Sequence, residues 1–262
     1  MAGILSRMTI LDSIILGIVE GVTEFLPVSS TGHLILTGEL LGLPATEFLK
    51  SFEIAIQLGA IMAVVVLYWR SFLDVGIVKR VLAAFVPTAI IGLLLHDLAK
   101  QYLLGNAMVV LVALAVGGVA LIIFELLHKE KEGAMQDVRS ITYAQAVVVG
   151  IFQAVAIIPG VSRSAATIVG GLVMGVGRVA IVEFSFLLAV PVMAAATALD
   201  LLKSAGTFSS ADFTNLGVGF VVSFVVALLS IRFLLQYVRK HTFIPFGIYR
   251  ILAALAFFLL VF

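Results

Sequence analysis

The apolar run at residues 10–43 is interrupted near its middle by EGVTEFLPVSSTGH, residues 20–33. A second apolar run, at residues 143–176, is interrupted in the same way by PGVSRSAAT, residues 159–167. The segments PVSSTG and PGVSRS within these stretches are rich in residues that break helices. Each half-run is then about 10–17 residues long, which is short of the roughly 20 residues that a helix needs to cross a bilayer. We therefore expect two re-entrant helix–loop–helix hairpins, at residues 10–43 and 143–176.

The composition places these hairpins in a membrane. Of the 262 residues, 62% are hydrophobic and 12% are charged. In a soluble domain about 45–50% of the residues are apolar and about 25% are charged. A net charge of +1 argues against a nucleic-acid partner, and the absence of cysteine excludes a disulfide scaffold or a thiolate metal site. We expect an all-α polytopic membrane protein that forms a single membrane domain over residues 1–262. Its six transmembrane helices are predicted at residues 50–69, 80–98, 106–127, 181–202, 215–236 and 244–262.

The charged loops predict the orientation. With six spans and two hairpins, nine positive charges fall on one side of the membrane: Arg70, Lys79, Arg80, Lys129, Lys131, Arg139, Arg178, Arg239 and Lys240. Four fall on the other side: Arg7, Lys50, Lys100 and Lys203. The positive-inside rule puts the first set in the cytoplasm and both termini outside. The first hairpin then enters from outside and the second from the cytoplasm.

The two hairpins are copies of one another. A shift of 133 residues aligns Gly17–Gly42 with Gly150–Gly175, and eight of the 26 positions are identical, where this composition gives about two by chance. Each copy, about 10–128 and 143–262, holds one hairpin and three spans. Because three is an odd number of crossings, the copies are predicted to be inverted. Inverted repeats with broken helices place a polar site near the midplane of the bilayer, so the two breaks should meet.

The first hairpin carries two acids on one helical face. Glu20 and Glu24 are four residues apart, and their equivalents in the second copy are Gln153 and Ile157. Two carboxylates inside a membrane repel one another and are costly to bury. They need a proton, an arginine or a metal ion, unless they are interfacial acids that snorkel or cap a helix.

Hydroxyl groups follow the acids. Ser29, Ser30 and Thr31 can cap the helix that begins there, or they can form an anion cradle together with its free amides. His33 can be an interior histidine with satisfied hydrogen bonds. Beside two glutamates and a run of hydroxyls, an acid/base or nucleophile is the better interpretation.

The second break carries an arginine between two serines, Ser162, Arg163 and Ser164. A guanidinium stays charged and binds phosphate oxygens bidentately, although Arg163 can also form a structural pair with Glu20 or Glu24. The set gathered near the midplane favours a phosphate group with a counter-ion as the ligand. It comprises acids, a histidine, hydroxyls, helix N-termini and an arginine.

These motifs resemble a known family. EGVTEFLPVSSTGH is similar to the first signature of the bacterial undecaprenyl-diphosphate phosphatases, the bacitracin-resistance proteins, and PGVSRSAAT is similar to their second. The stretches Phe52–Gly59, Glu183–Pro191 and Phe243–Arg250 also resemble the family. The resemblance implies a membrane hydrolase that removes the terminal phosphate of undecaprenyl diphosphate and so recycles the lipid carrier of peptidoglycan synthesis. It further implies a location in the bacterial plasma (inner) membrane with the site open to the outer, periplasmic side, a divalent-cation requirement, and bacitracin resistance.

Carried over residue by residue, the resemblance assigns the acid motif to Glu20 and Glu24, the polar loop to Ser29, Ser30, Thr31 and His33, and the phosphate-binding arginine to Arg163. We expect Arg163 and the loop around it, with Ser29, Thr31, Ser162 and Ser164, to hold the diphosphate of a polyprenyl lipid. Glu20 and Glu24 are expected to hold a divalent cation, Mg²⁺ or Ca²⁺. Ser30, His33 or water remain alternatives for the attacking group.

Two other classes of function compete with this prediction. A transporter or flippase for an anionic lipid or an anion also fits inverted repeats with broken helices. It has no obvious need for Glu20, Glu24 and His33 together. A structural scaffold leaves the acids within the membrane unexplained. The apolar faces of the spans can meet lipid or a second copy of the chain in a homodimer.

Overall fold

The structure is a computed structural model that describes residues 8–44, 46–103, 106–130, 133–134, 136–204 and 210–261. Over these residues it contains helices and no strand, so the expected all-α fold is confirmed. The α-helices are α1 (Ile10–Thr23), α2 (Ser30–Leu40), α3 (Glu47–Leu67), α4 (Val75–Tyr102), α5 (Ala107–Leu127), α6 (Tyr143–Ala154), α7 (Arg163–Val173), α8 (Arg178–Ser204), α9 (Ser210–Val238) and α10 (Ile244–Val261). Three short 3₁₀ turns join them: η1 (Ser71–Leu73), η2 (Val138–Ser140) and η3 (Val155–Ile157).

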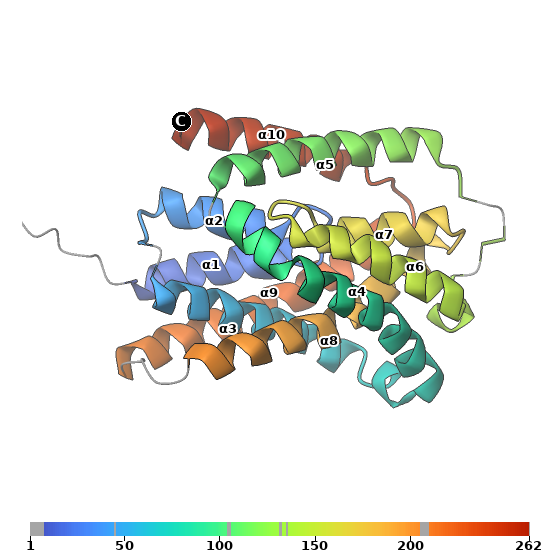
Figure 1. The fold of residues 1–262 in the computed structure, drawn as a ribbon, viewed down its shortest axis with the longest axis horizontal. Coiled ribbons are helices and arrows are strands. Elements are labelled where there is room, and N and C mark those ends of the chain that lie inside the picture. The colour runs from blue at the N-terminus through green and yellow to red at the C-terminus, as the bar shows by residue number, and fades with distance from the viewer. Residues whose placement is uncertain are drawn as a thin grey trace, which may run out of the picture.

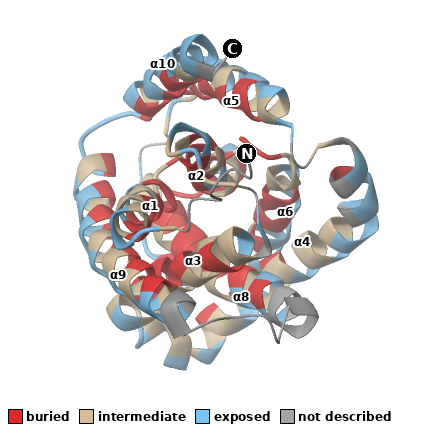
Figure 2. Cartoon of the chain, turned by 90° about the vertical axis from the view of Figure 1, so that its left-hand side faces the viewer, coloured by how far each residue is buried: buried red, intermediate tan, exposed pale blue. Residues whose placement is uncertain are grey.

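Most of the helices run along the long axis of the molecule (Figure 1). Seen from one end, α5 and α10 form a pair above the other helices (Figure 2). The most extensive contacts join α1 with α9, α3 with α9, α5 with α10, and α4 with α6. The first helix of each hairpin, α1 or α6, therefore packs against a long helix, α9 or α4.

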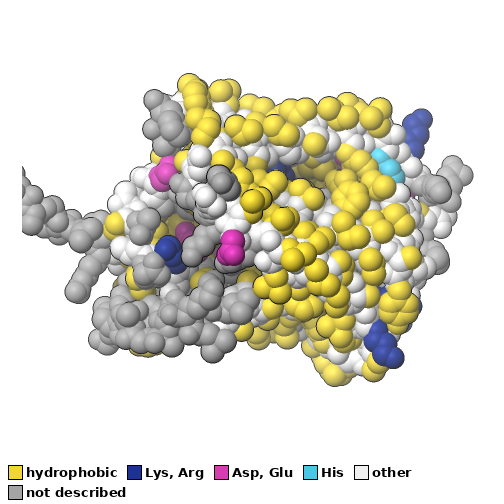
Figure 3. Space-filling model, in the orientation of Figure 1, with side chains coloured by type: hydrophobic (Ala, Val, Ile, Leu, Met, Phe, Trp, Pro, Cys, Tyr) yellow, Lys and Arg dark blue, Asp and Glu magenta, His cyan; other side chains and the backbone are white. Residues whose placement is uncertain are grey.

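Among the described residues, five helices are long and apolar enough to cross a membrane: Phe48–Leu67, Val75–Leu95, Ala107–Leu127, Arg178–Ala198 and Phe213–Val238. They correspond to the first five predicted spans. The segment predicted as the sixth span forms α10, whose apolar part, Ile244–Leu260, ranks only among the shorter apolar helices. On the face drawn in Figure 3, hydrophobic side chains cover the middle of the molecule, and the Lys and Arg side chains that stand out from it lie toward its ends.

The second helix of each hairpin, α2 or α7, begins earlier than the sequence predicted. Ser30–Gly32, expected in the first break, form the first turn of α2, and Arg163 and Ser164 form that of α7. The reason lies in the preceding serines, because the Ser29 and Ser162 side chains cap these helices by accepting hydrogen bonds from backbone amides. The breaks therefore end at the serines, and the next residues are held rigidly in a helix.

Helix boundaries repeat along the chain at the interval found in the sequence. Adding 133 to the bounds of α2 gives those of α7. Two residues after each helix comes a glycine with positive φ, Gly42 at 66° and Gly175 at 76°. This conformation suits glycine and is common just beyond a helix C-terminus. Both hairpins also begin with a capping box, at Thr9 and at Thr142.

Ion pairs tie together loops that were predicted to share the cytoplasmic side. Arg139 lies 3.2 Å from Asp74, and Arg178 lies 2.6 Å from Glu125 and 3.6 Å from Glu130. At the opposite ends of the helices, Asn215 donates to the carbonyl of Met8. Four charges of the orientation count, those of Arg7, Lys100, Lys131 and Lys203, belong to side chains outside the described part of the chain.

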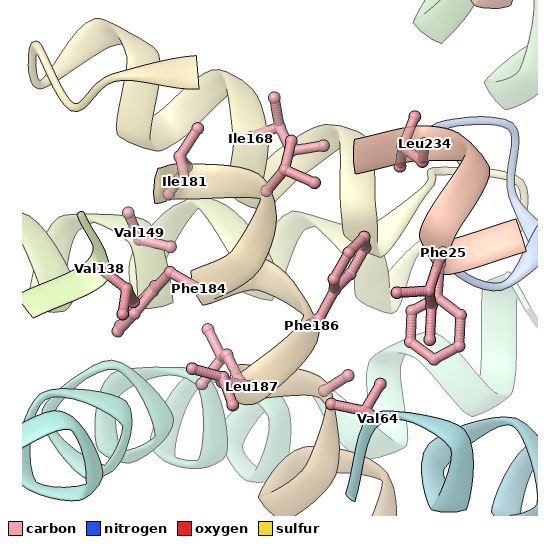
Figure 4. Packing of buried hydrophobic residues seen from close by; sticks show 14 of the residues in the cluster. Phe25, Val64, Val138, Val149, Ile168, Ile181, Phe184, Phe186, Leu187 and Leu234 are labelled. Atoms are coloured by element: carbon pink, nitrogen blue, oxygen red, sulfur yellow. The ribbon is translucent and has the colours of Figure 1, made fainter. Parts of the chain in front are cut away.

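Aromatic packing fixes the first break within the protein. Phe25 is fully buried and meets the ring of Phe186 on α8 edge-on, with the ring centroids 5.3 Å apart. Figure 4 shows Phe25 among buried side chains that include Phe186, Leu234 and Val64. The break is thus part of the hydrophobic core.

Glycines allow hairpin helices to cross long helices closely. A Cβ at Gly150 on α6 would lie 2.0 Å from the backbone oxygen of Ala84 on α4. At Gly17, its equivalent on α1, a Cβ would lie 2.9 Å from the backbone oxygen of Gly219 on α9. At both crossings backbone therefore packs against backbone.

Replacing Gly150 by alanine is expected to force α4 and α6 apart. Overpacking of this kind costs about 1–3 kcal/mol, so the Tm of the purified protein in detergent should fall by several degrees. Gly92→Ala on α4 is the matched control, because no heavy atom lies within 4 Å of a Cβ built there. Its Tm should be unchanged or higher, and equal Tm values for the two variants would contradict the close crossing.

Candidate active site

The two breaks meet, although they are far apart in the sequence. Ser164 in the first turn of α7 donates a hydrogen bond of 2.8 Å to the carbonyl of Phe25 in the first break. The Arg163 guanidinium lies 3.1 Å from the Glu24 carboxylate. Both side chains of this pair are largely buried, with 12% and 5% of their surface exposed. The expected meeting of the two hairpins is thus present in the structure.

Three predicted site residues form one connected group at this meeting point. The Ser30 hydroxyl donates to one oxygen of the Glu24 carboxylate, and Arg163 binds the other. Arg163 also donates to the backbone carbonyl of Ser185 on α8, at 2.9 Å, which fixes its position from a third element. Its Nε–H has no partner among the described residues. A hydroxyl on a carboxylate, next to a guanidinium with a free donor, is an arrangement that can bind and activate a phosphate group.

Glu20 lies one helical turn before Glu24 and is fully buried. Neither of its carboxylate oxygens has a hydrogen-bond partner among the described residues. A buried carboxylate without partners is costly, and two acids on one helix face are ligands that suit a hard divalent cation. The donor set therefore fits the expected cation, although no group of three or more acidic or histidine side chains suited to a metal occurs in the described part of the chain.

His33 uses both ring nitrogens away from this group. Nδ1 lies 2.8 Å from the carbonyl oxygen of Ser29, and Nε2 lies 2.8 Å from the hydroxyl of Tyr249 on α10. The ring is buried beside α10. The structure thus joins His33 to the first break through Ser29 and to the last helix through Tyr249.

The other residues predicted to bind phosphate are Ser29, Thr31, Ser162 and Ser164. Three of them, the serines, make contacts that stabilise the fold. Ser29 and Ser162 cap α2 and α7, which was one of the two interpretations of the serines. Thr31 is exposed. Only Ser164 of this set links the two breaks directly, through its bond to Phe25.

Arg250 is a residue at this site that was not among the predicted site residues. It is 1% exposed, and it lies on α10 with its guanidinium bonded to four backbone carbonyls. Those carbonyls belong to Pro27 in the first break, Gly160 in the second, and Ala113 and Leu114 on α5. Its position in the middle of an apolar helix was the available signal, because charges there are rare and functional or paired.

An apolar groove begins beside the second break. It has a volume of about 710 Å³ and runs between α5 on one side and α6 and α7 on the other. Val116, Phe124, Phe152 and Val169 are among its hydrophobic walls, and Ser162 is one of its few polar lining residues. The groove is partly open to the surface and lies on the face drawn in Figure 3.

The chain matches known proteins over nearly its whole length. A model of the family described as "Bacitracin resistance protein BacA" matches residues 13–256. An undecaprenyl-diphosphatase of Aquifex aeolicus is 51% identical over 256 residues, which are 96% of this chain and 100% of that protein. An undecaprenyl-diphosphatase of Sulfurihydrogenibium sp. is 50% identical over 96% of this chain and 99% of its own length. An undecaprenyl-diphosphatase of Wolinella succinogenes is 49% identical over 95% of this chain and 97% of its own length. The chain belongs to the BacA family of bacitracin resistance proteins.

Proposed function

We propose that this chain is an undecaprenyl-diphosphatase, a multi-pass membrane hydrolase that converts undecaprenyl diphosphate to undecaprenyl phosphate and inorganic phosphate. The observation that carries the proposal is the group of Glu24, Ser30 and Arg163, which joins the two breaks. Relatives about 50% identical over nearly the full length carry that name. The activity recycles a lipid carrier for peptidoglycan synthesis and accounts for the bacitracin resistance in the family's name.

The proposed topology has six spans and two re-entrant hairpins in an inverted repeat. Its support is the 133-residue interval between α2 and α7 and the exchange of contacts between the copies, since α1 packs on α9 as α6 packs on α4. The sixth span is α10. The ion pairs between the loops at Asp74–Arg139 and at Arg178 support one shared side, which we assign to the cytoplasm of a bacterial inner membrane. The termini and the opening of the site then face the periplasm.

In this mechanism Arg163 holds the diphosphate. Its free Nε–H and its planar guanidinium can bind two phosphate oxygens at once. Ser185 and Glu24 keep the side chain in place by their hydrogen bonds. In phosphoryl transfer, positioning and neutralisation of charge supply most of the catalysis.

Glu20 and Glu24 would hold the divalent cation, Mg²⁺ or Ca²⁺. Such a cation, when bound, neutralises charge on the phosphate oxygens. Glu20 is the better ligand of the two because its oxygens have no other partner, whereas those of Glu24 bind Ser30 and Arg163.

Ser30 is the attacking group that the contacts favour. Its hydroxyl proton already points to Glu24, which can accept it as the Ser30 oxygen bonds to the terminal phosphorus. The bond from that phosphorus to the bridging oxygen then breaks, and undecaprenyl phosphate leaves. Water hydrolyses the phosphoserine and releases inorganic phosphate. Trapping and mapping of a phospho-enzyme decides between Ser30 and the alternatives, in which His33 or water attacks.

The polyprenyl chain of the substrate would lie in the groove between α5 and the α6–α7 hairpin. The groove is apolar and partly open to the surface, and it begins beside Ser162, next to Arg163. A chain of this chemistry can leave the head group at the break and follow the groove into lipid.

A transporter or flippase for an anionic lipid is the competing function, because the repeated hairpins are typical of alternating access. Purified protein in detergent, where no gradient exists, separates the two. The proposal expects release of inorganic phosphate from undecaprenyl diphosphate with added Mg²⁺ or Ca²⁺. Transfer of the lipid between leaflets of liposomes, without any phosphate release, would favour the transporter.

Arg163→Lys is expected to lower the kcat for phosphate release by at least about 100-fold, because a point charge does not replace the bidentate fork. The helical circular dichroism should be retained. Turnover near that of the wild type would remove Arg163 from the mechanism.

Val116→Trp tests the groove. It should block the path of the long chain and raise the KM for undecaprenyl diphosphate about tenfold relative to the KM for farnesyl diphosphate. Val119→Trp is the matched control, since Val119 is an exposed valine on the same helix that does not line the groove. The same ratio of KM values in both variants would show that the chain lies elsewhere.

A further inference from the structure

The ring of His33 is held from two sides. On one side Nδ1 lies 2.8 Å from the Ser29 carbonyl oxygen, and on the other Nε2 lies 2.8 Å from the Tyr249 hydroxyl. The His33 and Tyr249 rings are nearly parallel, at 8°, and Phe257 meets the His33 ring edge-on at 88°. Two residues of α10 thus set the orientation of a histidine on α2.

These contacts define which nitrogen of neutral His33 carries the proton. A carbonyl oxygen can only accept, so Nδ1 is the donor to Ser29. Nε2 then has a lone pair, and the Tyr249 hydroxyl donates to it. With both nitrogens engaged, His33 acts on the first break through the Ser29 carbonyl.

Ser29 is held in a strained conformation. Its φ is 74°, and it is the one non-glycine residue with positive φ in the described part of the chain. Such a conformation persists only where neighbouring contacts enforce it. Ser29 directly precedes Ser30, whose hydroxyl binds Glu24, so the strained turn determines where that hydroxyl lies.

The repeat provides an internal comparison. At the position equivalent to Ser29, Ser162 caps its helix with an ordinary φ of −74°. The positions equivalent to His33 and Tyr249, each 133 residues away, hold Ala166 and Val116. The strained turn and His33 belong to the first copy, and Tyr249, which contacts His33, belongs to the second. At the three equivalent positions the chain has an unstrained serine, an alanine and a valine.

We propose that Tyr249 is a positioning residue for the reaction: its hydroxyl fixes His33, and His33 holds the Ser29 carbonyl in the turn that places Ser30 on Glu24. This inference rests on the proposed function, because the position of Ser30 matters only if this group acts on the substrate. Tyr249 and His33 act through the first break and need no contact with the phosphate.

A double-mutant cycle in the full-length protein tests the proposal. Tyr249→Phe removes the hydroxyl and keeps the ring, and it should lower the kcat for undecaprenyl diphosphate hydrolysis about tenfold or more, with KM changed by less than about twofold. Glycine adopts a φ of 74° without strain. In a Ser29→Gly background the same substitution should therefore lower kcat by less than about threefold.

Equal losses in the two backgrounds would overturn the proposal, as would an unchanged kcat for Tyr249→Phe alone. Tyr143→Phe is the control for loss of a half-exposed tyrosine hydroxyl, because Tyr143 lies on α6 with 50% of its surface exposed. Its kcat should equal that of the wild type.

A measurement that needs no turnover separates failure of this inference from failure of the proposed function. The chain has four histidines, so ¹⁵N-histidine NMR in detergent, with His33→Asn to assign the signal, reports the protonation of each ring nitrogen. We expect the proton on Nδ1, and a shift of the Nε2 resonance in Tyr249→Phe. A proton on Nε2 in the wild type, or an Nε2 resonance that does not respond to Tyr249→Phe, would overturn the inference even if the protein released no phosphate.

Discussion

Backbone carbonyls that are freed where a helix breaks inside an apolar protein must find donors, since neither lipid nor hydrophobic side chains supply any. Arg250 meets this constraint with one buried guanidinium, which binds Pro27 in the first break, Gly160 in the second, and two carbonyls of α5. A Cβ at Gly117 would lie 2.1 Å from the same guanidinium, so the glycine leaves the space that it fills. The other contacts between the breaks, Arg163 with Glu24 and Ser164 with Phe25, depend on backbones that are already held together in this way.

The two halves of the chain share a frame and differ in chemistry. α2 and α7 have the same length and the same serine cap, but Ser30 in one corresponds to Arg163 in the other. The acids of the first hairpin correspond to Gln153 and Ile157. One hairpin therefore contributes the carboxylates and the hydroxyl, and the other contributes the guanidinium. Under the proposed function neither hairpin forms the phosphate site alone, and the repeat brings together the unlike residues that this function needs.

Much of this architecture could be predicted from the sequence. Apolar runs too short to cross a bilayer predicted the hairpins, and the 133-residue repeat predicted that the breaks would meet. The pairing of Arg163 with an acid of the first hairpin followed from the expected meeting of the breaks. The contact of Tyr249 with His33 was beyond reach, because the two residues are 216 positions apart and no motif links them. The serines were ambiguous for a physical reason, since a hydroxyl at a helix N-terminus can cap the helix or bind an anion with the same groups. In the structure Ser29 and Ser162 are caps, and the break boundaries moved accordingly.

The central claim is that the two breaks together form one phosphate site, and a structure of the protein with its product, orthophosphate, tests it most directly. The account predicts a phosphate that contacts the Arg163 guanidinium from the second hairpin and the Ser30 hydroxyl from the first, with Glu20 facing it. A phosphate bound to residues of one hairpin alone, or ordered at another part of the chain while this group stays closed, would contradict it.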